Sequence, residues 1–436
     1  MDLSDAGARA PRRGGLPVTV IVLGFTSLFT DVGTEMIFPL LPVFLSETLG
    51  AGPTYVGLVE GAADTVANLM KFVSGVLADF VPRRKPLVLF GYGIASAVRP
   101  FVALATRPWH VLLVRVTDRV GKGIRGSPRD ALIADAAGDR AGRAFGFHQA
   151  MDNAGAVLGP LVATALLAAH APIRAVFWVA VIPGVIATTL VAFVREEPAD
   201  RAAGRARTAK DPSPAVGSGP AAPRGIGRPV VLYLVVLALF SLGNSSDAFL
   251  LLRARSLGLP TAQIPILWSV LNLSKVVWAY LGGDLADRVP RARVIASGWV
   301  VFAFVYLGLG RAWAQWHVWA LFVVYGVFYG LTEPVEKALL KDLVPSAYRG
   351  RAYGAYNLVV GVTALPAGLL AGVLWRVHGP ALALGTSALL AAAAAIALLV
   401  WDAWRPRPGG GGRPSSPAGA SGSGRSGAVG AARAAD

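Results

Sequence analysis

The chain has 436 residues, of which 54% are hydrophobic and 15% are charged, and its mean hydropathy is +0.56. These values exclude an ordinary soluble protein of this length. The absence of cysteine excludes disulfide bonds, thiolate metal sites and cysteine nucleophiles. The formal net charge of +16 fits either a nucleic-acid partner or a membrane protein with basic loops, and the position of the cations decides between them.

Apolar blocks long enough to cross a bilayer as helices recur along most of the chain. The first block is not a cleaved signal peptide, because it is too long and contains Asp31 and Glu35. We expect about twelve membrane-spanning helices. They lie near residues 17–45, 54–77, 85–106, 109–134, 144–168, 174–195, 229–252, 263–283, 292–312, 316–340, 350–374 and 380–402.

A segment rich in Pro, Gly and Arg divides these blocks into two equal groups and is typical of a linker. The predicted fold is an all-α membrane protein with two pseudo-symmetric six-helix bundles around a central cavity. The expected parts are a cytoplasmic N-terminal tail at 1–16, a first bundle at 17–195, a cytoplasmic linker at 196–228, a second bundle at 229–402 and a disordered cytoplasmic tail at 403–436.

The cations are distributed unevenly between alternate loops. If the N-terminus is cytoplasmic, the cytoplasmic loops collect most of them, for example Arg83, Arg84 and Lys85, whereas the opposite loops have few, such as Arg107 and Arg311. This asymmetry follows the positive-inside rule. It predicts a multi-pass protein of the cytoplasmic (inner) membrane with both termini in the cytoplasm, and it explains the net charge without a nucleic-acid partner.

The two groups of blocks share a repeated sequence. GVLADFVPRRKP at residues 75–86 returns as GDLADRVPRARV at residues 283–294. A duplicated helical unit is a signature of secondary transporters, and this G-x-L-A-D-x-x-P-R sequence resembles the cytoplasmic loop signature of the major facilitator superfamily. The resemblance implies that these loops stabilise a closed cytoplasmic gate without touching substrate; alternatively, their cations only set the topology. The candidate gating residues are Gly75, Asp79, Arg83, Arg84, Gly283, Asp287 and Arg288.

A second motif lies in the fifth block. Gly155, Gly159 and Pro160 form a G-x-x-x-G-P sequence that resembles the motif of proton-coupled antiporters in that superfamily. The family pattern usually continues with two glycines, and Ala163 and Thr164 stand here instead.

The fourth block contains the charged run RVTDRVGKGIRGSPRDALIAD at residues 115–135. On a helix, its ionisable residues up to Asp130 fall within an arc of roughly 140°. Each charge that faces lipid costs roughly 2.5–3.5 kcal/mol, so we expect this charged stripe to face the bundle interior. The run also contains a formal G-x-G-x-x-G, but a nucleotide-binding loop needs a preceding strand. Inside a helix, these glycines favour close helix packing.

Acidic residues on neighbouring blocks are candidate partners of the stripe. Asp31 and Glu35 lie one helical turn apart, and they are our first choice for proton coupling, because repulsion and desolvation favour the first protonation of such a pair. Arg115 resembles the start of the span-four motif that serves proton coupling in the superfamily, with Asp118 and Arg119 where Gln and Gly are usual. The alternative is a buried ion-pair network that only holds helices together. The candidates for proton coupling and the cavity are Asp31, Glu35, Glu60, Asp64, Arg115, Asp118, Arg119, Lys122 and Asp152.

The second half is less charged, and we expect much of the substrate contact there. Trp268, Trp278, Tyr325 and Tyr329 either line the cavity or serve as packing residues. The polar candidates for the substrate cavity are Asn244, Asp247, Asn272, Lys275, Glu333, Glu336 and Asn357.

These features predict a monomeric secondary active transporter of small organic solutes that works by alternating access. Proton-coupled export is the preferred hypothesis. Sodium is the alternative coupling ion, and uptake of an organic anion or siderophore-like solute is the alternative direction. A membrane-embedded enzyme or a non-transporting sensor is less consistent with the duplicated loops. The sequence has no H-E-x-x-H motif and no evident Ser-His-Asp arrangement, so we expect no catalysis, metal or cofactor.

Overall fold

The structure is a computed structural model that describes residues 15–80, 83–194, 196, 227–345 and 348–405. Nearly all of the expected N-terminal tail, linker and C-terminal tail lies outside the described residues. Within those ranges, the regular secondary structure is helical.

The first half begins with a long irregular helix. α1 (Val18–Ile37) continues into the 3₁₀ turn η1 (Phe38–Leu40), α2 (Leu41–Val43) and the π-helical turn η2 (Phe44–Thr48). The change of helix type coincides with Pro39 and Pro42, which cannot donate backbone hydrogen bonds. The following helices are α3 (Pro53–Phe80), α4 (Lys85–Val98), α5 (Pro100–Ala103), α6 (Pro108–Ala137), the short η3 (Gly138–Arg140), α7 (Ala141–Ala168), α8 (Ile173–Val179) and α9 (Val181–Ala192).

The second half begins with a broken helix, in which the chain unwinds between α11 (Arg228–Gly243) and α12 (Ala248–Ser256). A single uninterrupted span was expected there. The remaining helices are η4 (Thr261–Gln263), α13 (Ile264–Arg288), α14 (Arg291–Arg311), α15 (Gln315–Leu343), α16 (Arg349–His378) and α17 (Pro380–Trp404).

Among the described residues, ten helices or runs of consecutive helices are long and apolar enough to cross a membrane. α3, with 28 residues, and α6, with 30 residues, are equally long but more charged. Together with these two, the helices match the expected order of spans. The chain is a multi-pass membrane protein, and the predicted all-α membrane fold is confirmed.

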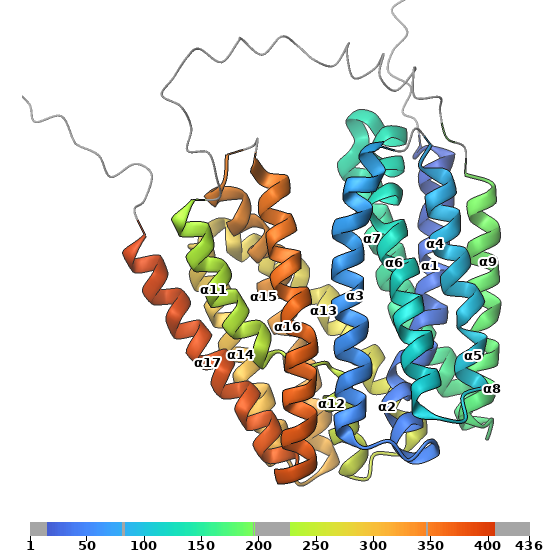
Figure 1. Cartoon of the computed structure of the whole chain (residues 1–436), viewed down its shortest axis with the longest axis vertical. Coiled ribbons are helices and arrows are strands. Elements are labelled where there is room, and N and C mark those ends of the chain that lie inside the picture. The colour runs from blue at the N-terminus through green and yellow to red at the C-terminus, as the bar shows by residue number, and fades with distance from the viewer. Residues whose placement is uncertain (1–14, 81–82, 195, 197–226, 346–347, 406–436) are drawn as a thin grey trace, which may run out of the picture.

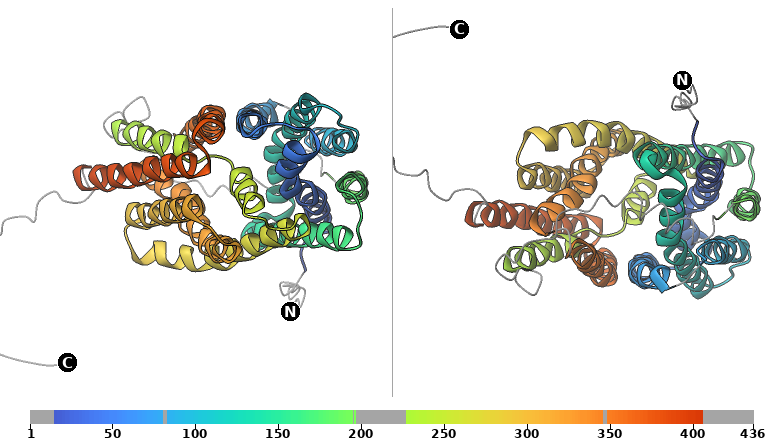
Figure 2. Two further views of the ribbon diagram at one scale, coloured as in Figure 1. Left: turned by 90° about the horizontal axis from the view of Figure 1, so that it is seen from below. Right: turned by 90° about the horizontal axis from the view of Figure 1, so that it is seen from above.

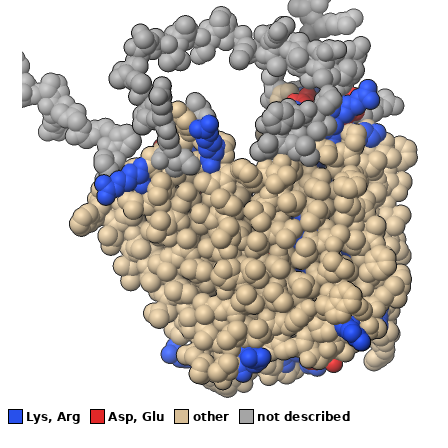
Figure 3. Space-filling model, in the orientation of Figure 1, with Lys and Arg blue, Asp and Glu red and all other residues tan. Residues whose placement is uncertain are grey.

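The helices form two bundles that lie side by side (Figures 1 and 2). α3 and α16 meet at one edge of the interface between the bundles, and α7 and α13 meet at the other. We call the end where α9 finishes and α11 starts the upper end, and the end that contains α2 and α12 the lower end (Figure 1). Figure 3 shows few charged side chains over the middle of one face, with Lys and Arg near its upper and lower ends, as a lipid-facing belt requires.

An aromatic cluster fills the centre of the second bundle. Phe302 of α14 stacks on Tyr306 with ring centroids 3.9 Å apart and packs edge-on against Phe240 and Phe328 at 5.3 and 5.1 Å. In lipid, helix association depends on such close packing, because the surrounding acyl chains are as apolar as the side chains. This cluster therefore holds α11, α14 and α15 together.

Truncation of the cluster tests this role. Phe302 is fully buried, whereas Phe304 in the same helix is 61% exposed. We expect Phe302→Ala to lower the free energy of unfolding by about 3–5 kcal/mol, and Phe304→Ala to change it by less than about 0.5 kcal/mol. Thermal and denaturant unfolding of the two purified variants in one detergent measures the difference. Equal stability of the variants would contradict the assignment of Phe302 to the core.

Candidate functional site

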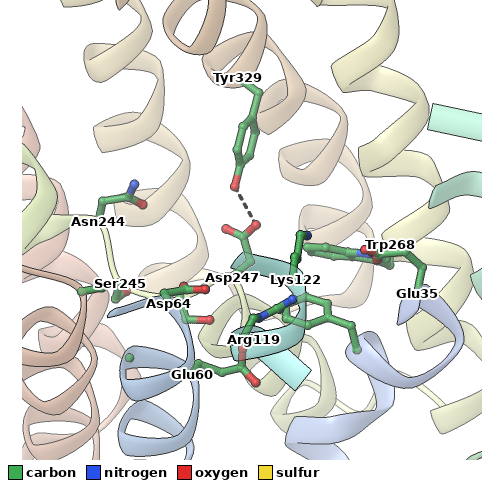
Figure 4. Close-up of a pocket in the computed structure, with 14 residues that line it drawn as sticks. Glu35, Glu60, Asp64, Arg119, Lys122, Asn244, Ser245, Asp247, Trp268 and Tyr329 are labelled. Carbon is green, nitrogen blue, oxygen red and sulfur yellow. Dashed lines mark hydrogen bonds between the residues drawn. The ribbon is translucent and has the colours of Figure 1, made fainter. Parts of the chain in front are cut away.

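A polar cavity, here called the central pocket, lies between the two bundles (Figure 4). Its volume is about 240 Å³, and a cavity of about 150 Å³ is known to accept a benzene molecule. The pocket is therefore large enough for a small organic solute. The first half contributes Glu35, Phe38, Glu60, Gly61, Asp64, Arg119 and Lys122, and the second half contributes Asn244, Ser245, Ser246, Asp247, Trp268, Tyr329 and Ala364.

Two buried ion pairs anchor α6 beside the pocket. Arg115 donates two hydrogen bonds to Glu60 of α3, with Nη2 2.6 Å from Oε2 and Nε 3.1 Å from Oε1. Asp118 lies 3.4 Å from Arg99 Nε, at the junction of α4 and α5. Because each of these charges has a partner on a neighbouring helix, the buried stripe is stabilised inside the protein.

Two other cations of α6 keep donors available to the pocket. Arg119 and Lys122 lie about one helical turn apart, and both line the pocket. Arg119 approaches Asp118 only to 3.8 Å, and its buried Nε has no hydrogen-bond partner among the described residues. Lys122 is exposed to the pocket and forms no ion pair within the described part of the chain.

The break between α11 and α12 forms the opposite wall. Asp247 immediately precedes α12, a favourable position for a carboxylate because helix N-termini carry partial positive charge. It accepts hydrogen bonds from the hydroxyls of Tyr325 and Tyr329 at 2.8 and 2.6 Å. Lys275 Nζ lies 3.9 Å from this carboxylate and 3.7 Å from the centroid of the Tyr329 ring. Irregular backbone is tolerated at membrane depth when it lines such a cavity.

Glu35 and Trp268 join the bundles at the pocket. Trp268 Nε1 of α13 donates a hydrogen bond of 2.6 Å to Glu35 Oε2 of α1, and the Trp268 ring packs on Phe38 at 4.9 Å. Ser269 and Asn272 of α13 donate to backbone carbonyls of α7, each at 3.0 Å. A carboxylate from one bundle therefore contacts a donor from the other within the pocket wall.

The G-x-x-x-G-P motif of α7 lies directly against the acidic residues of α1. A Cβ atom at Gly155 would lie 2.6 Å from the Leu28 carbonyl oxygen and 2.9 Å from Asp31 Cβ, and one at Gly159 would lie 3.1 Å from Glu35 Cβ. Pro160 is buried in the same helix. The two glycines therefore determine how closely α7 approaches Asp31 and Glu35.

Asp152 of α7, another first-half candidate acid, lies outside the pocket lining. Its Oδ2 is 3.6 Å from His148 Nδ1 one turn earlier. Asp31 also does not line the pocket; of the proposed acidic pair, only Glu35 does.

Five polar candidates of the second half do not line the pocket. Asn272 bonds across the bundle interface, and Lys275 lies behind Asp247. Glu336 is buried in the second bundle, where it accepts hydrogen bonds from Trp299 and Tyr356. Glu333 is exposed and pairs with Lys337, and Asn357 is half-buried in α16.

One gating candidate, Arg84, forms an ion pair at the upper end, and an equivalent pair lies in the second half. Arg84 pairs with Asp135 at the end of α6, and Arg291 pairs with Asp342 at the end of α15. Each pair ties the start of the third span of a half to the end of its fourth. Arg83 and Arg288 are exposed. Gly75, Asp79, Gly283 and Asp287 lie in α3 and α13 at positions whose surroundings the structure does not describe.

Several pocket residues were not selected from the sequence. They are Phe38, Gly61, Ser245, Ser246 and Ala364. The run Gly-Asn-Ser-Ser-Asp at residues 243–247 indicates a helix break that contains Ser245 and Ser246. Gly is typical of helix C-termini, and Asn, Ser and Asp are typical of N-caps. The role of Arg99 as the partner of Asp118 was also missed.

Two helical bundles around a polar pocket are typical of secondary transporters, and similarity to known proteins identifies the family. The sequence profile of the Major Facilitator Superfamily matches residues 23–309 and 248–433. The chain belongs to this superfamily.

Individual relatives agree with this assignment. An uncharacterized MFS-type transporter of Methanocaldococcus jannaschii is 30% identical over 83% of this chain and 89% of that protein. The multidrug resistance protein MdtH of Photorhabdus laumondii is 31% identical over 33% of this chain and 36% of that protein. The crystal structure of a peptide transporter POT variant superposes with a TM-score of 0.72, at 14% identity, and covers 90% of this chain and 96% of that one; this likeness supports the fold alone.

The glycines of α7 provide a test of the site geometry. Gly159→Ala would bring Cβ to 2.5 Å from the Val32 carbonyl oxygen, whereas Gly146 in the same helix has no atom within 4 Å of the equivalent position. We expect Gly159→Ala to lower stability by about 1–3 kcal/mol relative to Gly146→Ala, because α1 must move away. Unfolding of the two variants under identical conditions measures this. A Gly159→Ala protein as stable as Gly146→Ala would show that α1 and α7 are not in close contact.

Proposed function

We propose that this protein is a proton-coupled transporter that exports small organic solutes by alternating access of its two bundles to the central pocket. The observation that carries the proposal is the position of Glu35. This carboxylate lines the pocket and at the same time accepts a hydrogen bond from the opposite bundle. A change in its charge therefore acts both on a bound solute and on the contact between the bundles.

In this proposal, proton coupling arises because the proton and the solute both interact with the acids that line the pocket. Glu35 and Asp64 line the pocket without an ion-pair partner within 4.0 Å among the described residues. A proton that neutralises one of these acids removes a negative charge from the solute site. Where these acids attract a cationic group of the solute, protonation weakens solute binding, and such negative coupling between two ligands is what exchange requires.

The Arg115–Glu60 and Arg99–Asp118 pairs receive a structural role in this proposal. Both pairs are buried and each acid already faces a guanidinium. Loss of one partner would leave an uncompensated buried charge, which is costly. Of the two unpaired pocket acids, Glu35 and Asp64, we assign Glu35 to proton binding because it also contacts the other bundle. Asp31 and Asp152 on the neighbouring α1–α7 surface are accessory acids.

Export is the proposed direction, and the partial similarity to MdtH, named as a multidrug resistance protein, supports it. We place the protein in the cell membrane with the upper end in the cytoplasm, where the Arg84–Asp135 and Arg291–Asp342 pairs would stabilise the closed gate. The basic loops at that end favour this orientation.

Transport by reconstituted vesicles tests the assignment of Glu35. A screen of radiolabelled organic solutes with an imposed pH gradient identifies a transported compound, and proton exchange predicts its accumulation in the acidic compartment. We expect Glu35→Gln to reduce gradient-driven accumulation at least about tenfold, the effect of about 1.4 kcal/mol, while gradient-free solute exchange continues. Asp130→Asn, which changes an exposed acid of α6, is the matched control.

Other outcomes are equally informative. Full gradient-driven accumulation by Glu35→Gln and by Asp31→Asn would remove both acids from the mechanism. Accumulation of the solute in the alkaline compartment would instead indicate symport and favour the uptake function.

A further inference from the structure

We infer that the solute of the central pocket is a small zwitterion with an apolar body, whose anionic group binds Arg119 and Lys122 of the first bundle and whose ammonium group binds Asp247 and Tyr329 of the second. This inference rests on the proposed function, because it takes the central pocket as the solute site. Figure 4 shows these side chains around one cavity.

The wall formed by the second bundle is suited to an ammonium group and already holds one. Lys275 Nζ lies 3.7 Å from the Tyr329 ring centroid, 5.0 Å from the Trp268 ring centroid and 3.9 Å from Asp247 Oδ2. An ammonium over aromatic rings and near a carboxylate is stabilised by cation–π and Coulomb attraction. Lys275 itself is not part of the pocket lining, whereas Asp247, Trp268 and Tyr329 are. Asp247, Trp268 and Tyr329 can therefore also contact an ammonium group that approaches from the pocket.

The wall formed by the first bundle is suited to a carboxylate. Arg119 has a buried Nε without a partner among the described residues, and Lys122 is exposed to the pocket. Arg115, one turn away, is fully engaged by Glu60. A guanidinium and an ammonium that both retain free donors form strong charge-assisted hydrogen bonds with an oxyanion.

Groups of both signs line the pocket, so a zwitterion complements it better than a simple ion does. A monovalent cation would contact Asp247 and leave the free donors of Arg119 and Lys122 unused, and a monovalent anion would leave the surface formed by Asp247, Trp268 and Tyr329 unused. A zwitterion satisfies both walls, and because the walls belong to different bundles, it also links the bundles while it is bound.

The size and the aromatic lining limit the apolar body. A volume of about 240 Å³ exceeds that of a cavity that accepts benzene. Phe38, Trp268 and Tyr329 offer aromatic faces against which a ring can pack. Phenylalanine is therefore a suitable probe, and phenethylamine and 3-phenylpropanoate are the matched compounds that lack its carboxylate and its ammonium.

Calorimetric binding of these three probes to the full chain in lipid nanodiscs, without a pH gradient, tests the inference. We expect phenylalanine to bind at least about tenfold more tightly than either matched compound. Lys122→Met should abolish the preference for phenylalanine over phenethylamine, and Asp247→Asn should abolish the preference over 3-phenylpropanoate. Lys341→Met, which changes an exposed lysine at the end of α15, is expected to retain both preferences.

The comparison of probes on the unaltered protein requires no variant, so it remains decisive if Asp247→Asn does not fold. No binding of phenylalanine, or equal binding of phenethylamine or 3-phenylpropanoate, would overturn the inference. Because binding is measured without a gradient, loss of proton-driven transport with an intact binding preference would overturn only the proposed function.

Discussion

A charged side chain inside a bilayer is stable only where protein or water surrounds it, and the first bundle is built around this constraint. Its most charged helix, α6, crosses the protein with Arg115 paired to Glu60 and Asp118 paired to Arg99. These pairs bind α6 to its neighbours on both sides. Two further cations of the stripe, Arg119 and Lys122, line the polar pocket between the bundles.

The two bundles contribute different chemistry to that space. The first supplies charged side chains, of which Glu60 is held by its ion pair with Arg115 while Arg119 and Lys122 keep donors available. The second supplies a helix break, whose carboxylate Asp247 is held by two tyrosine hydroxyls, and an aromatic surface. Trp268 joins them by its hydrogen bond to Glu35. The glycines of α7 allow α1 to approach closely beside Asp31 and Glu35. The same short segment of α1 therefore packs against α7, contacts the other bundle through Glu35 and lines the pocket.

Much of the first bundle could be predicted from the sequence because helical periodicity is local. The spacing of Arg115, Asp118, Arg119 and Lys122 places them on one side of a helix whatever surrounds it, and the cost of exposing them to lipid directs that side inward. The same reasoning does not identify partners. Nothing in the spacing of Arg99 indicates that it meets Asp118, and the buried position of Glu336, with Trp299 and Tyr356, depends on three separate helices.

The sequence by itself determined the all-helical membrane fold, its division into two related halves and the inward direction of the first part of the charged stripe, from Arg115 to Arg119, whereas Asp130 at its other end is exposed. Hydropathy, repetition and helical period are properties of the chain alone. Only the tertiary structure decided which acids face the pocket, that the helix break at residues 244–247 forms one of its walls, and that Glu35 contacts Trp268. Each of these depends on distances between segments more than a hundred residues apart, and such distances are set by packing between helices.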